Sequence, residues 1–285
     1  IDYFETVNKS LKINNMDQSI EEKTTRLKEI FRSMGRVMVA YSGGVDSTFL
    51  LRMARESLGR ENVIAVTALS PLYPDRELAE AKRMAQEMGV KHILIESNEL
   101  EIEGFSKNPP NRCYFCKKEL FEELKNLAQK EPVPYVVEGS TLDDEKDHRP
   151  GRRAIQEFGI RSPLQEAGFT KEEVRKLSHV LGLPTWDKPS FACLASRFPY
   201  GEEITPEGLK MVDEAEDFLF SLGFKQVRVR HYQNLARIEV YPEEMTRLLD
   251  GSLRETVVSR LKEIGYRYVT LDLQGFRSGS MNEVL

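Results

Sequence analysis

Two sets of side chains in this sequence have types and spacings suited to chemistry. The first is the hexapeptide Ser42-Gly43-Gly44-Val45-Asp46-Ser47, and the second is the three cysteines Cys113, Cys116 and Cys193. A glycine-rich turn before a helix presents free backbone N–H groups to a phosphate, and the helix dipole adds positive charge there. The serine hydroxyls can donate hydrogen bonds, and Asp46 can hold Mg²⁺ or accept from a bound group. The hexapeptide therefore indicates a nucleotide-phosphate site.

The residues flanking the hexapeptide predict the strand and the helix that position it. The run 37–41 is apolar and rich in β-branched residues, and apolar residues then recur at helical spacing over 49–58. Glycines between them let the backbone approach a ligand closely. The lysine of the common G-x-x-x-x-G-K-[ST] phosphate loop is missing, so this is a different loop. The simpler interpretation is a glycine turn that only caps a helix.

Further strands and helices alternate after this point. Apolar runs at 62–68, 91–95 and 134–139 are separated by helical patterns, which predicts a parallel sheet. Ligands in such sheets bind at the carboxyl ends of the strands. Ala68, Gly139 and Ser140 lie at two of these ends, so we expect them to face the same nucleotide pocket as the hexapeptide.

Three regions follow from the pattern. Residues 1–16 are polar and without periodicity, which predicts a flexible arm, and Ser19 with Glu22 resembles a capping box that starts the first helix. Residues 17–203 form the predicted α/β domain. Residues 204–285 read as helix, strand, strand, helices and strand, which predicts a small α+β domain for substrate binding or oligomerisation.

The composition excludes several classes of protein. The chain has 285 residues, 40% of them hydrophobic, which is enough for packed cores and excludes global disorder. Its formal net charge of −5 gives no general attraction for nucleic acid or anionic membranes. There is no signal-type apolar segment and no run of about 18 apolar residues. We therefore expect a cytoplasmic protein without membrane or nucleic-acid partners.

The three cysteines leave several explanations open. An odd number in a reducing compartment argues against a disulfide framework. The thiols can be buried core residues, or ligands of a structural zinc with a fourth donor such as His148. They can also hold a [4Fe–4S] cluster with one open iron, or act directly as nucleophile or sulfur donor. A sulfur source beside an ATP-activated carbonyl would make a thiolating enzyme.

Several motifs carry a resemblance to known families. The hexapeptide resembles the S-G-G-x-D-S loop of the ATP pyrophosphatase superfamily, whose members split ATP between its α and β phosphates. Over about residues 20–285 the chain resembles the sulfur transferase family of the nickel-pincer cofactor pathway of lactate racemase. The further segments that carry this resemblance are 143–151, 193–201, 227–230 and 275–279.

The resemblance implies a reaction and its cofactors. ATP, with Mg²⁺, adenylates a carboxylate of pyridinium bis-carboxylic acid mononucleotide and releases pyrophosphate. Sulfur then displaces AMP to leave a thiocarboxylate, and two rounds give the bis-thiocarboxylate. Members with one cysteine at position 193 give up its own sulfur, whereas three-cysteine members carry a [4Fe–4S] cluster. Because this chain adds Cys113 and Cys116, the resemblance favours a cluster held by all three cysteines and loaded by sulfide or another sulfur source. It also implies a homo-oligomer.

The resemblance gives roles to polar side chains outside these two sets. It suggests that the substrate's phosphate or carboxylates are bound by Arg197, Arg228, Arg230 and Arg277. The alternative for the paired strands is a solvated salt-bridge ladder that includes Arg237 and Glu239. Asp143 and Asp147 are either magnesium ligands or loop caps.

Three rival functions remain at this stage. A tRNA thiolase of the same superfamily would need a basic RNA-binding surface, which the charge balance does not suggest. An amide-forming synthetase would use ammonia and leave the cysteines unexplained. A non-catalytic nucleotide-binding protein with structural zinc would release no pyrophosphate when given substrate.

Overall fold

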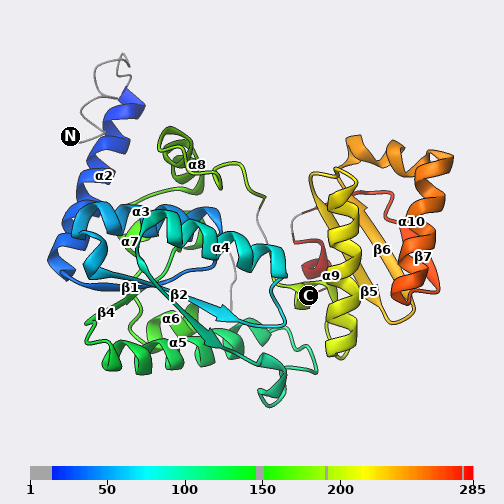
Figure 1. Ribbon diagram of the computed structural model, residues 1–285, viewed down its shortest axis with the longest axis horizontal. Helices are drawn as coiled ribbons and strands as arrows, with labels where there is room; N and C mark the ends of the chain where they lie inside the picture. Colours follow the sequence, from blue (N-terminus) through cyan, green and yellow to red (C-terminus); the bar gives the residue numbers. More distant parts are fainter. Residues whose placement is uncertain (1–14, 146–150, 190–191, 278, 285) are drawn as a thin grey trace.

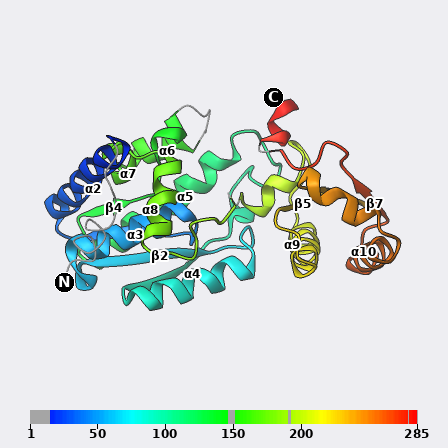
Figure 2. The same ribbon diagram turned by 90° about the horizontal axis from the view of Figure 1, so that it is seen from above.

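The computed structural model describes residues 15–145, 151–189, 192–277 and 279–284. Two sheets organise them (Figure 1). We call the elements from α2 to η4 the first unit and those from α9 to η6 the second unit. The two units lie side by side in both ribbon views (Figures 1 and 2).

The first unit is built on a four-stranded parallel sheet in the order β3-β2-β1-β4. The strands are β1 (Val37–Ala40), β2 (Val63–Leu69), β3 (Lys91–Glu96) and β4 (Tyr135–Val137). Alternate residues of β1 face opposite sides, because Val37 and Val39 join one core cluster while Met38 joins another. Helices cover both faces (Figure 1). The predicted α/β fold with a parallel sheet is confirmed.

The helices of the first unit follow the predicted positions closely. They are α2 (Asn15–Met34), α3 (Val45–Leu58), α4 (Asp75–Met88), α5 (Arg112–Lys130), α6 (Arg152–Glu157), α7 (Pro163–Glu166) and α8 (Lys171–Val180). The capping-box interpretation of Ser19 is wrong, because the helix already runs from Asn15 through it. The corresponding box at α8 is present, with Thr170 and Glu173 capping each other.

The second unit is a three-stranded sheet with two helices. Its elements are α9 (Pro206–Ser221), β5 (Val227–Tyr232), β6 (Leu235–Val240), α10 (Gly251–Ile264) and β7 (Tyr268–Leu271). Strand β6 is central, antiparallel to β5 and parallel to β7. The small α+β architecture expected for this part of the chain is therefore present. The 3₁₀ segments within the described ranges are η1 (Arg60–Asn62), η2 (Glu99–Glu101), η3 (Leu142–Glu145), η4 (Leu194–Arg197), η5 (Pro242–Leu249) and η6 (Ser280–Val284).

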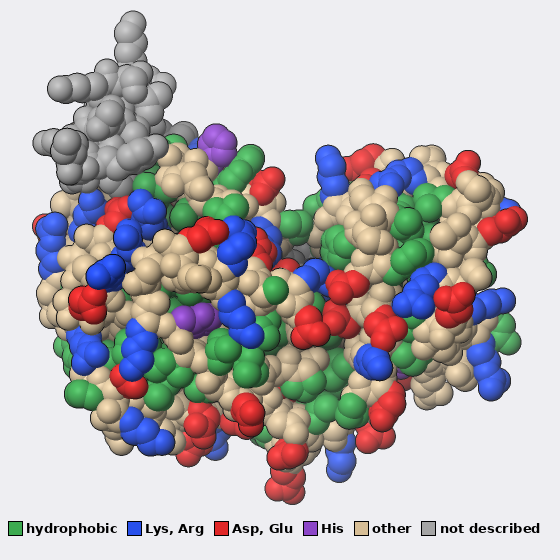
Figure 3. All heavy atoms as spheres, viewed as in Figure 1, with side chains coloured by type: hydrophobic (Ala, Val, Ile, Leu, Met, Phe, Trp, Pro, Cys, Tyr) green, Lys and Arg blue, Asp and Glu red, His purple; other side chains and the backbone are tan. Residues whose placement is uncertain are grey.

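The two units share an apolar cluster and several ion pairs. Leu209 and Val212 of α9 belong to the same buried cluster as Leu72 and Phe105 of the first unit. Across this contact, Arg76 pairs with Asp213 and Asp217 and stacks on the ring of Phe220. The surface is hollowed where the units meet, and basic and acidic side chains are interspersed over the visible face (Figure 3).

No helix within the described ranges has both the length and the apolar character needed to cross a membrane.

Candidate active site

The hexapeptide forms a tight turn between β1 and α3, as predicted. The hydroxyl oxygens of Ser42 and Ser47 are 3.1 Å apart, and Ser47 also donates to the Gly44 carbonyl at 3.2 Å. Gly43 has a φ of 72°, and a Cβ at this position would lie only 2.9 Å from that of Ala81. Glycine is required here for both backbone conformation and space.

The end of β4 meets this turn. A Cβ on Gly139 would lie 3.1 Å from the Ser47 backbone nitrogen, so the two loops are in close contact. Ser140 donates through its backbone N–H and its hydroxyl to the carboxylate of Glu138, at 3.0 and 2.8 Å. Glu138 is buried and accepts from Ser162 as well. The prediction that Gly139 and Ser140 share a site with the hexapeptide agrees with this placement.

One carboxylate oxygen of Asp46 pairs with a lysine, whereas the other has no hydrogen-bond partner among the described residues. Lys171 Nζ lies 3.1 Å from Asp46 Oδ2. The other oxygen, Oδ1, is buried and has no hydrogen-bond partner among the described residues. Burial raises the pKa of this carboxyl, and the Lys171 ammonium opposes the change. A hard cation such as Mg²⁺ would satisfy the unused oxygen.

Lys188 also reaches the turn, and sequence reasoning missed it. Its ammonium donates to the Gly43 carbonyl at 3.3 Å and pairs with Glu77 at 2.7 Å and with Glu80. The long connection that carries Lys188 showed no periodic signal. Its place in the sequence therefore gave no indication of a cation beside this turn.

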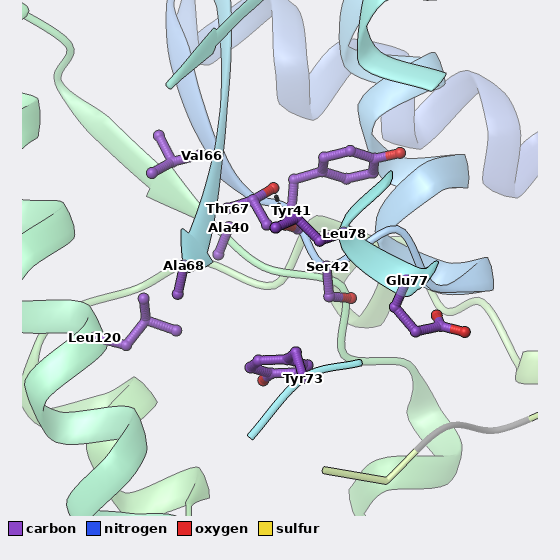
Figure 4. A pocket seen from close by; sticks show the side chains of 10 residues that line it. All are labelled: Ala40, Tyr41, Ser42, Val66, Thr67, Ala68, Tyr73, Glu77, Leu78 and Leu120. Carbon is purple, nitrogen blue, oxygen red and sulfur yellow. Dashed lines mark hydrogen bonds between the residues drawn. The ribbon is translucent and has the colours of Figure 1, made fainter. Parts of the chain in front are cut away.

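A pocket opens next to the turn (Figure 4). Ser42, Ala68, Tyr73 and Leu120 are among the residues that line it, and Glu77 stands at its edge near Ser42. The walls are mainly apolar, and a hydroxyl comes from the phosphate loop. Such a lining suits the flat base of a nucleotide, with the phosphates of the nucleotide extending toward the turn.

The three cysteines come from two segments that meet beside this pocket. Cys113 and Cys116 lie at the start of α5, one turn apart, and Cys193 immediately precedes η4. Cys113 is exposed, whereas the other two are partly buried. The segment carrying Cys193 is tied to the pocket wall, because Leu194 donates its N–H to the Leu72 carbonyl at 2.8 Å.

Tyr73 connects the pocket with the cysteines. Burial raises its pKa well above the usual value, and negative charge on Cys116, Cys193 or Cys113 would raise it further. Tyr73 also packs against the same apolar cluster as Cys116 and Cys193, so these cysteines lie next to the pocket. Burial also raises the pKa of Cys116, as does the carboxylate of Glu99, whose Oε1 lies 3.8 Å from the sulfur.

The cysteines suit a soft metal by donor type. Three thiols from neighbouring segments are the donors that iron–sulfur clusters take. Within the described ranges, however, no three or more His, Cys, Asp or Glu side chains are already arranged to hold a metal ion. His148, the candidate fourth zinc ligand, and Asp147 lie outside those ranges. Asp143 accepts from the Lys171 N–H at 2.6 Å, which is the loop-cap arrangement.

Arg197 is wholly buried beside Cys193 and is engaged on every side. It pairs bidentately with Glu216 of α9, at 2.9 and 2.8 Å. Its remaining nitrogen donates to the carbonyls of Ala192 and Cys193. In this structure it holds the Cys193 segment and does not face solvent.

Arg228 and Arg230 lie on β5 and are only 4% exposed, so the solvated-ladder interpretation is wrong for them. They are covered because the segment before α9 packs on this face: Arg230 donates to the Ser196 carbonyl at 2.9 Å. Arg230 also pairs bidentately with Glu239. Burial lowers the pKa of Arg228 to about 9, and the charge of Arg197 adds to this effect. Arg277 is partly exposed and pairs with Glu283.

Comparison with known proteins identifies the family. The NAD synthase family matches residues 13–119. The chain is 48% identical over 267 residues to an uncharacterized protein of Synechocystis sp., covering 93% of this chain and 99% of that protein. It is 42% identical over 268 residues to pyridinium-3,5-bisthiocarboxylic acid mononucleotide synthase of Lactiplantibacillus plantarum, covering 94% and 96% of the two chains. The chain belongs to this synthase family. It is therefore an enzyme, and the resemblance to an ATP-using sulfur transferase family is confirmed.

More distant similarity reaches other ATP-using enzymes. A tRNA-specific 2-thiouridylase of Desulforamulus reducens is 27% identical over 193 residues, about half of each chain. The bisthiocarboxylic acid mononucleotide synthase aligns with 94% of this chain, whereas the thiouridylase aligns with 54% of it.

Proposed function

We propose that this enzyme converts a carboxylate of pyridinium bis-carboxylic acid mononucleotide into a thiocarboxylate, in the synthesis of the nickel-pincer cofactor. The observation that carries the proposal is the position of Tyr73, which lines the pocket beside the hexapeptide and packs against the same apolar cluster as Cys116 and Cys193. Activation and sulfur delivery can therefore occur in one place. The name of the relative from Lactiplantibacillus plantarum supports the product.

The first step is adenylation at the turn after β1. Backbone N–H groups of the hexapeptide and the helix dipole of α3 hold the phosphates. Mg²⁺ would bind the unused oxygen of Asp46, and Ala68, Gly139 and Ser140 complete the nucleotide site. A substrate carboxylate oxygen attacks the α-phosphorus, the bond to the β-phosphate oxygen breaks, and pyrophosphate leaves.

The second step is sulfur transfer. Sulfur attacks the carbonyl carbon of the acyl adenylate, a C–S bond forms, and the C–O bond to AMP breaks with its electron pair going to AMP. Cys113, Cys116 and Cys193 would hold a [4Fe–4S] cluster, which leaves one iron open for a sulfide. The sulfide or other sulfur source replaces what each turnover consumes, so the protein is not consumed.

Arginines of the second unit complete the proposal. The partly exposed Arg277 would bind the substrate's phosphate or carboxylates, and the buried Arg228, Arg230 and Arg197 would add positive charge from beneath the surface, Arg197 close to Cys193. We further propose a domain division near residue 203, an N-terminal arm that ends where α2 begins at Asn15, a homo-oligomer and a cytoplasmic location. Sedimentation analysis and cell fractionation test the last two points.

The deciding experiment uses protein purified without oxygen. We expect about four iron and four sulfide per chain, and loss of both in Cys113→Ala. With ATP, substrate and sulfide, the wild type should release pyrophosphate and exchange oxygen for sulfur on the substrate. Cys193→Ala should still release pyrophosphate but should form no thiocarboxylate.

Other outcomes reject specific parts of the proposal. Zinc in place of iron, without pyrophosphate release, would make this a nucleotide-binding protein with a structural metal. Conversion of Cys193 to dehydroalanine after one turnover would show a sacrificial cysteine. Thiolation of tRNA in place of the mononucleotide would reassign the substrate.

A further inference from the structure

Asn108 lies where the two cysteine-bearing segments meet. Its side chain is fully buried, and its φ of 52° places it in the left-handed region. Asparagine is one of the few residues besides glycine that adopt this conformation, and such backbone persists where surrounding contacts fix it. Its position in the loop before α5 therefore reflects specific contacts.

Every hydrogen-bonding group of its amide is used. The Asn108 Nδ2 group donates to the carbonyls of Phe198 and Pro199, at 3.1 and 2.7 Å. Its Oδ1 accepts from Arg112 Nη1 at 2.8 Å. Because a reversed amide would point its oxygen at two carbonyls and its nitrogen at a cation, these partners fix its orientation.

The neighbouring backbone extends the same connection. The Asn108 carbonyl accepts from the Gly201 N–H at 3.0 Å, and the Ser106 carbonyl accepts from the Ile204 N–H at 2.8 Å. Arg112, itself buried, stacks over the ring of Tyr200 at 4.9 Å. The loop before α5 is thus fastened to the segment after η4 at several successive points.

The fastened segments are those that carry the thiols. Asn108 is five residues before Cys113, and its acceptor Phe198 is five residues after Cys193. These cysteines are separated by about 80 residues of chain that includes β4 and α6 to α8. Among the described contacts, those of Asn108 are the side-chain hydrogen bonds that join the two segments directly.

We propose that Asn108 is a positioning residue that keeps the Cys193 segment beside Cys113 and Cys116, so that the three thiols can close on one soft ion or cluster when it binds. The inference rests on the proposed function of the cysteine site. Preorganised supporting contacts of this kind typically change metal affinity about 10–100-fold when they are lost.

The test measures thiolate convergence directly in iron-free, reduced protein. Cd²⁺ is titrated into the chain, and the ultraviolet thiolate-to-cadmium band reports how many thiolates bind. The wild type should give a three-thiolate band, and Cys193→Ser should give a two-thiolate band. Asn108→Asp keeps size and backbone preference but replaces the donor by an acceptor facing two carbonyls. We expect it to resemble Cys193→Ser, with Cd²⁺ affinity lowered about 10–100-fold.

Two further variants separate positioning from general stability. Asn108→Gly tolerates the backbone conformation and lacks the amide, so it tests the same contacts if the aspartate variant does not fold. Gln233→Gly is the matched control, because Gln233 has nearly the same φ, 50°, at an exposed turn between β5 and β6. It should bind Cd²⁺ like the wild type. Pyrophosphate release should persist in the Asn108 variants while thiocarboxylate formation falls.

The outcomes distinguish the two proposals. A two-thiolate band in the wild type would reject the three-cysteine site, and the role of Asn108 with it. A three-thiolate band with unchanged affinity in a folded Asn108→Asp or Asn108→Gly protein would reject the positioning role alone. Equal loss of pyrophosphate release and thiocarboxylate formation would show a merely structural role and would also reject it.

Discussion

The buried pair of Arg197 and Glu216 offers a quantitative test of how the two units are held together. Both side chains are 0% exposed, and two hydrogen bonds of 2.9 and 2.8 Å join them. Glu216 also accepts from the Val229 N–H at 2.9 Å. Glu216→Gln keeps the shape but leaves the guanidinium without its counter-ion. Removing one partner of a buried pair costs about 3–5 kcal/mol.

Urea unfolding followed by circular dichroism and by fluorescence of the single tryptophan, Trp186, measures this cost. With a slope of about 3 kcal/mol per molar urea, the unfolding midpoint should fall by roughly 1–1.7 M. Glu283→Gln is the matched control, because its pair with Arg277 is 60% and 34% exposed. An exposed pair contributes about 0–1 kcal/mol, so its midpoint should move by no more than about 0.3 M.

Acid should reduce the difference between wild type and Glu216→Gln. Burial alone would raise the pKa of Glu216, but the Arg197 charge and its hydrogen bonds outweigh burial and lower it. A lowered pKa stabilises the folded protein fully above the unfolded value, about 4.3, and this contribution is lost as pH falls through the folded pKa. A midpoint shift no larger than that of the control, or a difference that grows in acid, would refute the reasoning.

Three further predictions concern the nucleotide and cysteine sites. Gly139→Ala should raise KM for ATP about tenfold or more without unfolding the protein, because its Cβ would lie 3.1 Å from the Ser47 nitrogen. An unchanged KM would show that this close approach does not matter for ATP binding. Lys188→Gln should raise KM for ATP about tenfold, because the Lys188 ammonium reaches the Gly43 carbonyl of the turn, and Lys188→Arg should largely keep the wild-type KM. Equal KM values in the two variants would show that the positive charge at this position is not what binds ATP. In iron-free protein at pH 8, iodoacetamide should modify Cys113 before Cys116, because Cys113 is exposed while burial raises the pKa of Cys116. Peptide mass spectrometry measures the order of modification, and the reverse order would contradict this prediction.

The structure around the turn after β1 was predictable because its signals are local. An apolar run, a glycine turn and a helical pattern follow one another over 37–58, and parallel topology then brings Gly139 to the same sheet edge. The start of α2 was predicted four residues late, because a serine followed by a glutamate also occurs inside helices.

Long-range packing accounts for what the sequence did not reveal. Alternation placed Arg228 and Arg230 opposite the apolar face of β5, which normally means solvent, and only the tertiary structure shows the segment that covers them. Lys188 and Asn108 have partners up to 145 residues away, and no periodicity or motif marks such contacts. Motifs marked the residues predicted to supply the chemistry, whereas the residues that hold these motifs in place carry no such mark.

The segment from Cys193 to Gly201 is attached to both units at once. Asn108 holds its far end to the first unit, and Arg197 binds its near end to Glu216 of the second. Any rotation of one unit against the other must therefore displace the Cys193 backbone. The position of the Cys193 thiol is therefore set by both units together and not by the first unit alone.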